Sequence, residues 1–308
     1  MASDKALNAE KKLVWKGLVY AVIGAIGFSG KAILIKLSYA YGVDSATLIM
    51  YRMLFALPFF LVMALWSWTQ ALKGSQTLTR QDLLKIVFMG FIGYYLSSYL
   101  DFLGLNYVSA GLERLILYLS PSLVLLLSWL VYKRPVTKAR FLALALSYAG
   151  VVVVFAKELS LQGQNVLLGS ALVFMSASTY AVYLMLSEHM LKKISSLGLV
   201  GSASLVASLC CIVQFLVLRP MSAADVPVEV IHLSILNALF CTVLPIFMVM
   251  KAIELMGPAL TSQIGMIGPM STILMGYLFL NEPLNVWTGL GTLFVVSGVF
   301  CVSKFGEK

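Results

Sequence analysis

The chain has 308 residues, of which 60% are hydrophobic and 11% are charged, and its mean hydropathy is +0.94. A soluble protein of this length cannot bury so much apolar surface, so the composition excludes a soluble globular fold and predicts a protein that lies in lipid. The net charge is +9, but the basic residues are scattered between apolar runs without interleaved aromatic residues, which argues against nucleic acid as a partner.

In chain order, the sequence contains ten apolar segments, each close to the ~20 residues that an α-helix needs to cross a bilayer. Polar and apolar residues do not alternate within them, which favours helices over membrane strands. We therefore predict an all-α integral membrane protein of ten transmembrane helices. The predicted spans are residues 16–38, 46–68, 83–105, 109–131, 138–156, 167–190, 198–218, 229–251, 259–280 and 285–303.

Lys and Arg are unequally shared between the two sets of loops. With the N-terminus in the cytoplasm, sixteen basic residues fall in cytoplasmic segments, whereas the outer segments hold only Lys157 and Arg219. Because basic loops stay in the cytoplasm, we predict a multi-pass protein of the cell inner (plasma) membrane whose N- and C-termini are both cytoplasmic.

Two parts of the sequence repeat each other. Residues 121–154 and 269–302 align without a gap at a shift of 148 positions, so that Pro121 falls on Pro269. An internal repeat of this kind is typical of secondary transporters, in which the substrate site lies between the two halves.

The loops inside the two copies carry opposite charge. Lys133-Arg134 in the first copy falls on Asn281-Glu282 in the second, as expected if the two loops lie on opposite sides of the membrane. Five spans in each half would also make the second half enter the membrane upside down. We therefore predict two inverted five-helix repeats around a central cavity, the first over residues 1–158 and the second over residues 165–304.

Four motifs connect these segments with a known family. They are Arg52 after Leu48-Ile49-Met50-Tyr51, Ser120-Pro121, Gly268-Pro269, and Asn281-Glu282-Pro283-Leu284. With them the chain resembles the EamA-type family of the drug/metabolite transporter (DMT) superfamily over nearly its whole length. The resemblance implies a ten-helix bundle with a central cavity lined by spans 1, 3, 4, 6, 8 and 9, but it names no substrate. One departure is Lys133-Arg134-Pro135-Val136, which replaces the family's Gly-Glu-Arg/Pro-Leu loop in the first half.

Charged residues inside the predicted spans are candidates for a site, because each costs ~2.5–3.5 kcal/mol unless it is paired, solvated or used. From their depth along the helices, we place all of them in the outer half of the bilayer. Four are positive and two are negative, which predicts a cationic pocket for a carboxylate or another anionic group. These residues are Lys31, Lys36, Arg52, Asp101, Glu113 and Arg114.

Lys31 lies deepest and is least able to extend to water, so we expect it to contact the substrate. Glu113 or Asp101 could carry a coupling proton if burial favours the neutral carboxyl. The competing hypothesis is structural: Asp101 pairs with Arg114 or Arg52 and holds helices together.

Hydroxyl groups form stripes on two predicted spans. Such stripes suit contact with water or substrate, or alternatively hydrogen bonds between helices worth ~0.6 kcal/mol each. The stripes are Tyr94, Ser98 and Asp101 on the third span, and Ser176, Tyr180, Tyr183 and Ser187 on the sixth.

Small and helix-breaking residues mark the last two spans. In the ninth, Ser262 precedes Gly268-Pro269, where freed backbone groups could bind substrate or a kink could serve movement. In the tenth, Gly289 and Gly291 are expected to allow close helix packing. The predicted substrate-binding residues are therefore Lys31, Tyr94, Ser98, Asp101, Glu113, Arg114, Tyr180, Tyr183 and Ser262.

Together these features favour a secondary (non-ATP) transporter of a small metabolite, an amino acid or organic anion, that works by alternating access with efflux as the favoured direction. The expected partners are the substrate, the lipid bilayer and a coupling proton or other ion. Multidrug efflux of lipophilic compounds is the alternative, although Lys31 in the first span would repel cations. An intramembrane enzyme is disfavoured, because the sequence lacks the motifs of metalloproteases and serine hydrolases. Four scattered cysteines lack metal-ligand spacing, so we expect no cofactor and no metal.

Overall fold

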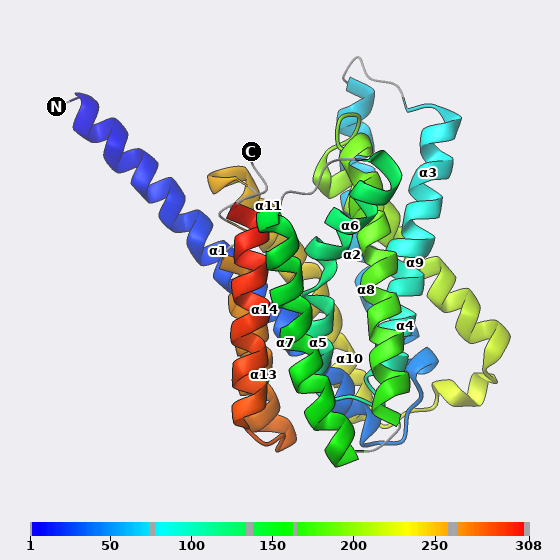
Figure 1. The fold of residues 1–308 in the computed structure, drawn as a ribbon. Helices are drawn as coiled ribbons and strands as arrows, with labels where there is room; N and C mark the ends of the chain where they lie inside the picture. Colours follow the sequence, from blue (N-terminus) through cyan, green and yellow to red (C-terminus); the bar gives the residue numbers. More distant parts are fainter. Residues whose placement is uncertain are drawn as a thin grey trace.

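The computed structural model describes residues 2–73, 78–133, 138–162, 165–257, 261 and 264–304. Across these ranges every regular element is a helix, which confirms the predicted all-α class. The helices run side by side as a bundle (Figure 1). Their bounds follow in chain order.

The first half contains α1 (Ala2–Tyr39), α2 (Ser45–Lys73), α3 (Arg80–Gly90), the π-helical turn η1 (Phe91–Leu96), α4 (Ser97–Gly104), α5 (Ala110–Leu117), α6 (Ser120–Tyr132) and α7 (Lys138–Gln162). The second half contains α8 (Asn165–Met190), α9 (Ser196–Leu218), the 3₁₀ turn η2 (Met221–Ala224), α10 (Val228–Ala238), the π-helical turn η3 (Leu239–Val243), α11 (Leu244–Met256), α13 (Ile267–Leu280) and α14 (Val286–Lys304).

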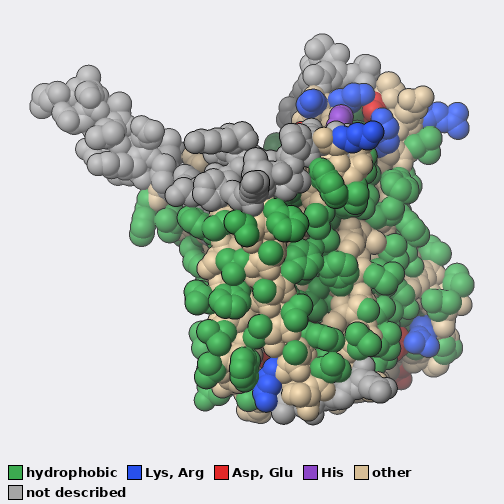
Figure 2. Space-filling view, viewed as in Figure 1, with side chains coloured by type: hydrophobic (Ala, Val, Ile, Leu, Met, Phe, Trp, Pro, Cys, Tyr) green, Lys and Arg blue, Asp and Glu red, His purple; other side chains and the backbone are tan. Residues whose placement is uncertain are grey.

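The surface of the bundle is that of a membrane protein. In the described part of the chain, seven helical segments are long and apolar enough to cross a bilayer, and two shorter apolar helices cover Ile267–Leu280 and Val286–Cys301. Large apolar side chains point outward, such as Val217, which is 74% exposed. Figure 2 shows a wide hydrophobic zone with Lys and Arg gathered at one end of the visible face. The protein is therefore a multi-pass membrane protein.

The two ends of the bundle differ in charge. One end, here named the basic end, carries Arg80 at the start of α3, Lys133 after α6, and Lys192-Lys193 after α8. The other, here named the opposite end, carries the turn after α1 and the turn between α13 and α14. Lys133 and Asn281 thus lie at different ends, as the charge difference between their loops predicts.

The first helix of each half packs against helices of the other half. α1 packs against α11 and α13, whereas α8 packs against α4 and α6. The leading helix of each half thus contacts the third and fourth spans of the other half. α2 packs along α9 and α7 along α14, so each of these pairs joins equivalent helices.

The backbone irregularities of the two halves also correspond at the shift of 148 residues. η1 falls on η3, and Tyr118, at the break between α5 and α6, falls on Met266 before α13. Their dihedral angles agree: φ −69° and ψ −9° for Tyr118, against φ −64° and ψ −11° for Met266. Lys133 (φ 52°) falls on Asn281 (φ 54°), and these are the two described non-glycine residues with positive φ. This agreement supports the predicted repeat and extends it to residues before 121 in the first half and before 269 in the second half.

Close packing between α7 and α14 depends on Gly150 and Gly291. A Cβ on Gly291 would lie 2.6 Å from the carbonyl oxygen of Gly150 and would also overlap Val154. Gly289 is different, since a Cβ there would meet nothing within 4 Å. The prediction of close packing is therefore right for Gly291 and wrong for Gly289.

We expect Gly291→Ala to lower the melting temperature of the purified protein, because the α7 backbone cannot move aside as a flexible side chain would. Gly289→Ala on the same helix is the matched control. It should leave the melting temperature unchanged or raise it, because alanine favours a helix over glycine by about 1 kcal/mol. Equal effects of the two substitutions in a thermal unfolding assay would contradict this account of the α7–α14 contact.

Candidate functional site

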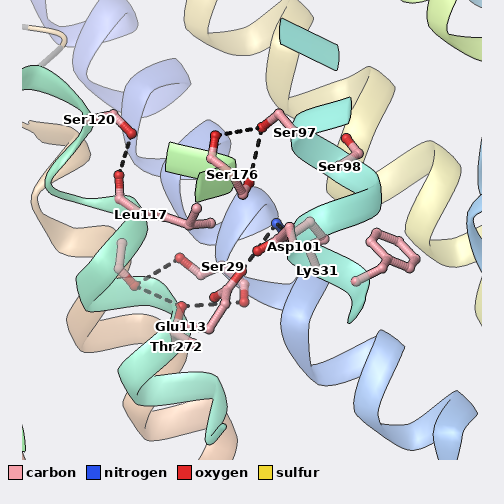
Figure 3. Close-up of polar contacts among 12 residues, drawn as sticks. Ser29, Lys31, Ser97, Ser98, Asp101, Glu113, Leu117, Ser120, Ser176 and Thr272 are labelled. Carbon is pink, nitrogen blue, oxygen red and sulfur yellow. Dashed lines mark hydrogen bonds and ion pairs between the residues drawn. The ribbon is translucent and has the colours of Figure 1, made fainter. Parts of the chain in front are cut away.

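A buried cluster of three charged side chains joins α1, α4 and α5 (Figure 3). The Nζ atom of Lys31 lies 2.5 Å from Oδ2 of Asp101 and 3.2 Å from Oε1 of Glu113. The side chains are 14%, 3% and 0% exposed, respectively. Three of the predicted site residues thus meet in one place, close to the opposite end of the bundle.

Local structure places Glu113 at this position. Ser109 caps α5 by accepting a hydrogen bond from the backbone N–H of Leu112 at 3.0 Å, and Glu113 follows in the first turn of that helix. The helix dipole stabilises an acidic side chain there. α5 ends after only eight residues, and Pro121 lies in the first turn of α6, where no backbone N–H is needed.

A set of hydroxyl contacts fastens α1 to α13 beside the cluster. Ser29 donates from Oγ to the carbonyl of Gly268 at 2.9 Å, and Thr272 donates from Oγ1 to the carbonyl of Ser29 at 3.4 Å (Figure 3). Both side chains are buried. Sequence reasoning missed these two residues. The cluster therefore lies where helices from both halves of the chain meet.

The charges within the cluster do not balance, because two carboxyl groups face one ammonium. Oδ1 of Asp101 and both carboxylate oxygens of Glu113 have no hydrogen-bond partner among the described residues, and Glu113 has only the ion pair with Lys31. The predicted pairing of Asp101 with Arg114 or Arg52 is wrong, since Asp101 pairs with Lys31. Asp101 thus joins two helices through an ion pair, as the structural hypothesis expects, but its partner is Lys31.

Arg52 is held by neighbouring side chains. It is 5% exposed, donates from Nη2 to Oγ of Ser98 at 3.0 Å, and stacks its guanidinium 4.9 Å from the ring centroid of Phe102. Ser98, a predicted substrate ligand, therefore binds Arg52 in this structure.

Arg114 differs from the other buried cations. It is next to Glu113 on α5 and half-buried, and its Nε has no hydrogen-bond partner within the described part of the chain. It also forms no ion pair with any described residue. Gly268 provides the room it occupies, because a Cβ there would lie 3.1 Å from Nη2. Within the described ranges, Nε of Arg114 is thus a donor that remains available to a ligand.

The predicted tyrosines form a second cluster. The ring centroids of Tyr94 and Tyr183 are 4.9 Å apart, those of Tyr180 and Tyr183 5.7 Å, and the hydroxyl of Tyr94 donates to that of Tyr183 at 3.5 Å. Tyr94 precedes Asp101 by seven residues, which is ~10 Å along a helix, so the tyrosine cluster lies closer to the basic end. Ser176 from the sixth-span stripe hydrogen-bonds Ser97 across α8 and α4 at 3.1 Å, which matches the interhelical alternative. Ser262 lies outside the described residues.

Comparison with known sequences identifies the family. The sequence profile of the EamA-like transporter family matches residues 15–156 and 167–304, which is nearly the whole chain in two stretches. The chain belongs to the EamA-like transporter family. The resemblance predicted from the four motifs is therefore confirmed, and the protein is a membrane transporter.

Individual relatives agree with this assignment. YcbK, an uncharacterized transporter of Bacillus subtilis (strain 168), is 28% identical over 310 residues, with 95% of each chain covered. An uncharacterized transporter of Archaeoglobus fulgidus is 25% identical over 73% of this chain and 79% of its own. A protein of known crystal structure, 13% identical, superposes with a TM-score of 0.65 over 95% of this chain and 99% of its own, which shows a shared fold.

We expect Lys31→Met to destabilise this EamA-like protein by about 3 kcal/mol, because two buried carboxyl groups would lose the cation with which both form an ion pair. Adding Asp101→Asn to Lys31→Met should restore part of the loss, since it removes one of the two facing charges. Lys251→Met is the control: Lys251 and Glu254 form an exposed pair at the basic end, worth at most about 1 kcal/mol. Chemical or thermal unfolding in detergent measures all three. Equal losses for Lys31→Met and Lys251→Met would contradict a stabilising role of the cluster.

Proposed function

We propose that this protein is a secondary (non-ATP) transporter that moves a small metabolite bearing a carboxylate, an amino acid or organic anion, by alternating access, with efflux as the favoured direction. The observation that carries the proposal is the buried Lys31–Asp101–Glu113 cluster with unpaired Arg114 beside it, at the meeting point of both halves. Ionised groups in a bilayer core are expensive, and in transporters they mark substrate or ion pathways.

We further propose that the chain crosses the cell inner (plasma) membrane ten times, as two inverted repeats over residues 1–158 and 165–304 with both termini in the cytoplasm. The packing of α1 and α8 supports this arrangement, because the first helix of each half lies against helices of the other half. The same contacts could break and form on alternate sides of a central site when one half rocks against the other. The basic end would face the cytoplasm.

Arg114 is our candidate for the substrate carboxylate. A guanidinium can bind a carboxylate through two parallel hydrogen bonds, and Nε of Arg114 is a donor that no described residue uses. Lys31 was the residue expected from the sequence to bind the anion, but two carboxyl groups already hold it. Lys31 therefore acts with them as the place where a coupling proton binds, since a proton on Asp101 or Glu113 would balance the charge of the cluster. Tyr94, Tyr180, Tyr183 and Ser262 stay candidates for the rest of the substrate.

The topology can be tested with cysteines at two equivalent corners. Asn281→Cys should react with a membrane-impermeant maleimide added to intact cells, because its corner would face outward. Lys133→Cys should react only after the cells are permeabilised. The unmodified chain, with its four cysteines, measures background labelling. Reaction of both positions from the same side would exclude inverted repeats.

The role of Arg114 can be tested once the exported compound is found by comparing metabolites released from cells with and without the protein. We expect Arg114→Gln to lower its flux in proteoliposomes at least about tenfold, because a hydrogen bond to a charged group contributes about 1.5–3 kcal/mol. Glu113→Gln should keep exchange of the compound but lose its response to an imposed pH gradient. Arg219→Gln, at an exposed pair with Asp44, is the control and should leave flux unchanged. Release dominated by hydrophobic cations, or full flux of Arg114→Gln, would refute the anion site.

A further inference from the structure

A pocket of about 370 Å³ opens at the opposite end of the bundle, apart from the buried cluster. It lies between α1, the start of α5, α7, and the turn between α13 and α14, so both halves form its wall. These elements lie at the lower end of the bundle in Figure 1. Its volume is within the range of pockets that bind small molecules. Three charged residues line it: Lys36, Glu158 and Glu282.

Glu158 is a buried carboxylate with no ion-pair partner among the described residues. It is 8% exposed, and its carboxylate accepts hydrogen bonds from the backbone N–H of Ser109, at 3.2 Å, and from the Ser109 hydroxyl. It forms no ion pair with any residue in the described ranges. A buried charge of this kind is costly unless a counter-charge reaches it. The pocket is the side from which a counter-charge could come.

Glu282 adds a second carboxylate from the other half of the chain. Its Oε1 accepts a hydrogen bond from the backbone N–H of Ala110 at 2.9 Å and lies 3.6 Å from Nζ of Lys36. Lys36 pairs with Glu282 and also acts electrostatically on Glu158, so the pocket contains two carboxylates that share one ammonium. Its charge is −1 when all three groups are ionised.

We propose that this pocket binds a small organic compound through a primary ammonium group held between Glu158 and Glu282. An ammonium has three N–H donors, and each carboxylate has lone pairs beyond those that Ser109, Ala110 and Lys36 use. The bound ammonium would neutralise the pocket and give Glu158 an ion-pair partner of its own. This site goes beyond the proposed function, because it stands apart from Arg114 and recognises the opposite charge.

Substituting Lys36 should change the affinity for an amine in the direction opposite to that expected for Glu158. Its ammonium occupies the pocket beside Glu282 and repels a second cation, so removing its charge should strengthen binding of an amine. Removing the charge of Glu158 should weaken it. A pocket that binds through apolar contact alone would respond to neither substitution.

The experiment uses the full-length protein in lipid nanodiscs and n-butylamine, which is an ammonium at pH 7. Butan-1-ol and butyrate serve as the neutral and anionic probes. Binding is measured by equilibrium dialysis and by the shift in melting temperature. We expect butylamine to bind and to raise the melting temperature, Glu158→Gln to weaken its binding at least tenfold, and Lys36→Met to tighten it. Glu254→Gln, an exposed carboxylate at the basic end, should leave binding unchanged.

The binding experiment can succeed or fail independently of the proposed transport function. Arg114→Gln, which should lose transport, is expected to keep the affinity for butylamine. Three outcomes would overturn the ammonium site: butan-1-ol binding as tightly as butylamine, unchanged affinity in Glu158→Gln, or weaker binding in Lys36→Met. Because Glu158→Gln and Lys36→Met are expected to act in opposite directions, general destabilisation of the protein cannot imitate the expected pattern.

Discussion

Lys31, Asp101 and Glu113 hold one another in a place where an isolated charge is costly. On insertion scales each charge in a bilayer costs about 2.5–3.5 kcal/mol, and this cost is reduced only when opposite charges meet. The need for that contact fixes how α1, α4 and α5 are rotated against each other. Ser29 and Thr272 then attach α1 to α13, because Ser29 donates to the carbonyl of Gly268 and Thr272 donates to the carbonyl of Ser29. The charged cluster, whose residues all belong to the first half, therefore lies at the boundary with the second half.

The irregular backbone segments suggest how this boundary could move. π-helical turns and helix breaks are places where the regular hydrogen-bond ladder is interrupted and where helices bend. They occur in pairs at equivalent positions: η1 with η3, and Tyr118 with Met266. Because η1 leads directly into α4, which carries Asp101, bending there would move Asp101 relative to Lys31. Bending at η1 would therefore alter the ion pair that joins α4 to α1.

Sequence patterns predicted the repeat and the buried charges, because a lipid bilayer leaves little freedom in both. The shift between Pro121 and Pro269 gave the correspondence that the backbone angles extend, and the cost of buried charge selected Lys31, Asp101 and Glu113. The partner of Asp101 was predicted wrongly, because hydropathy gives the depth of a residue but not the rotation of its helix. Ser29 and Thr272 gave no signal, since a hydroxyl can bond its own helix and is inexpensive in lipid. Spacing could not distinguish Gly291 from Gly289 either, because only the position of α7 does so.

The order of charges along α5 bears on which substrates fit. The pocket with Glu158 and Glu282 lies at the start of α5, the cluster around Glu113 follows, and Arg114 comes next. Gly111 in the pocket wall and Arg114 are three residues apart, or ~4.5 Å along a helix. A lipophilic cation could use the first of these positions but would be repelled at Arg114. An organic anion would be repelled by the two carboxylates of the pocket and attracted by Arg114. The pocket and Arg114 therefore select ligands of opposite charge, which fits two separate sites better than one.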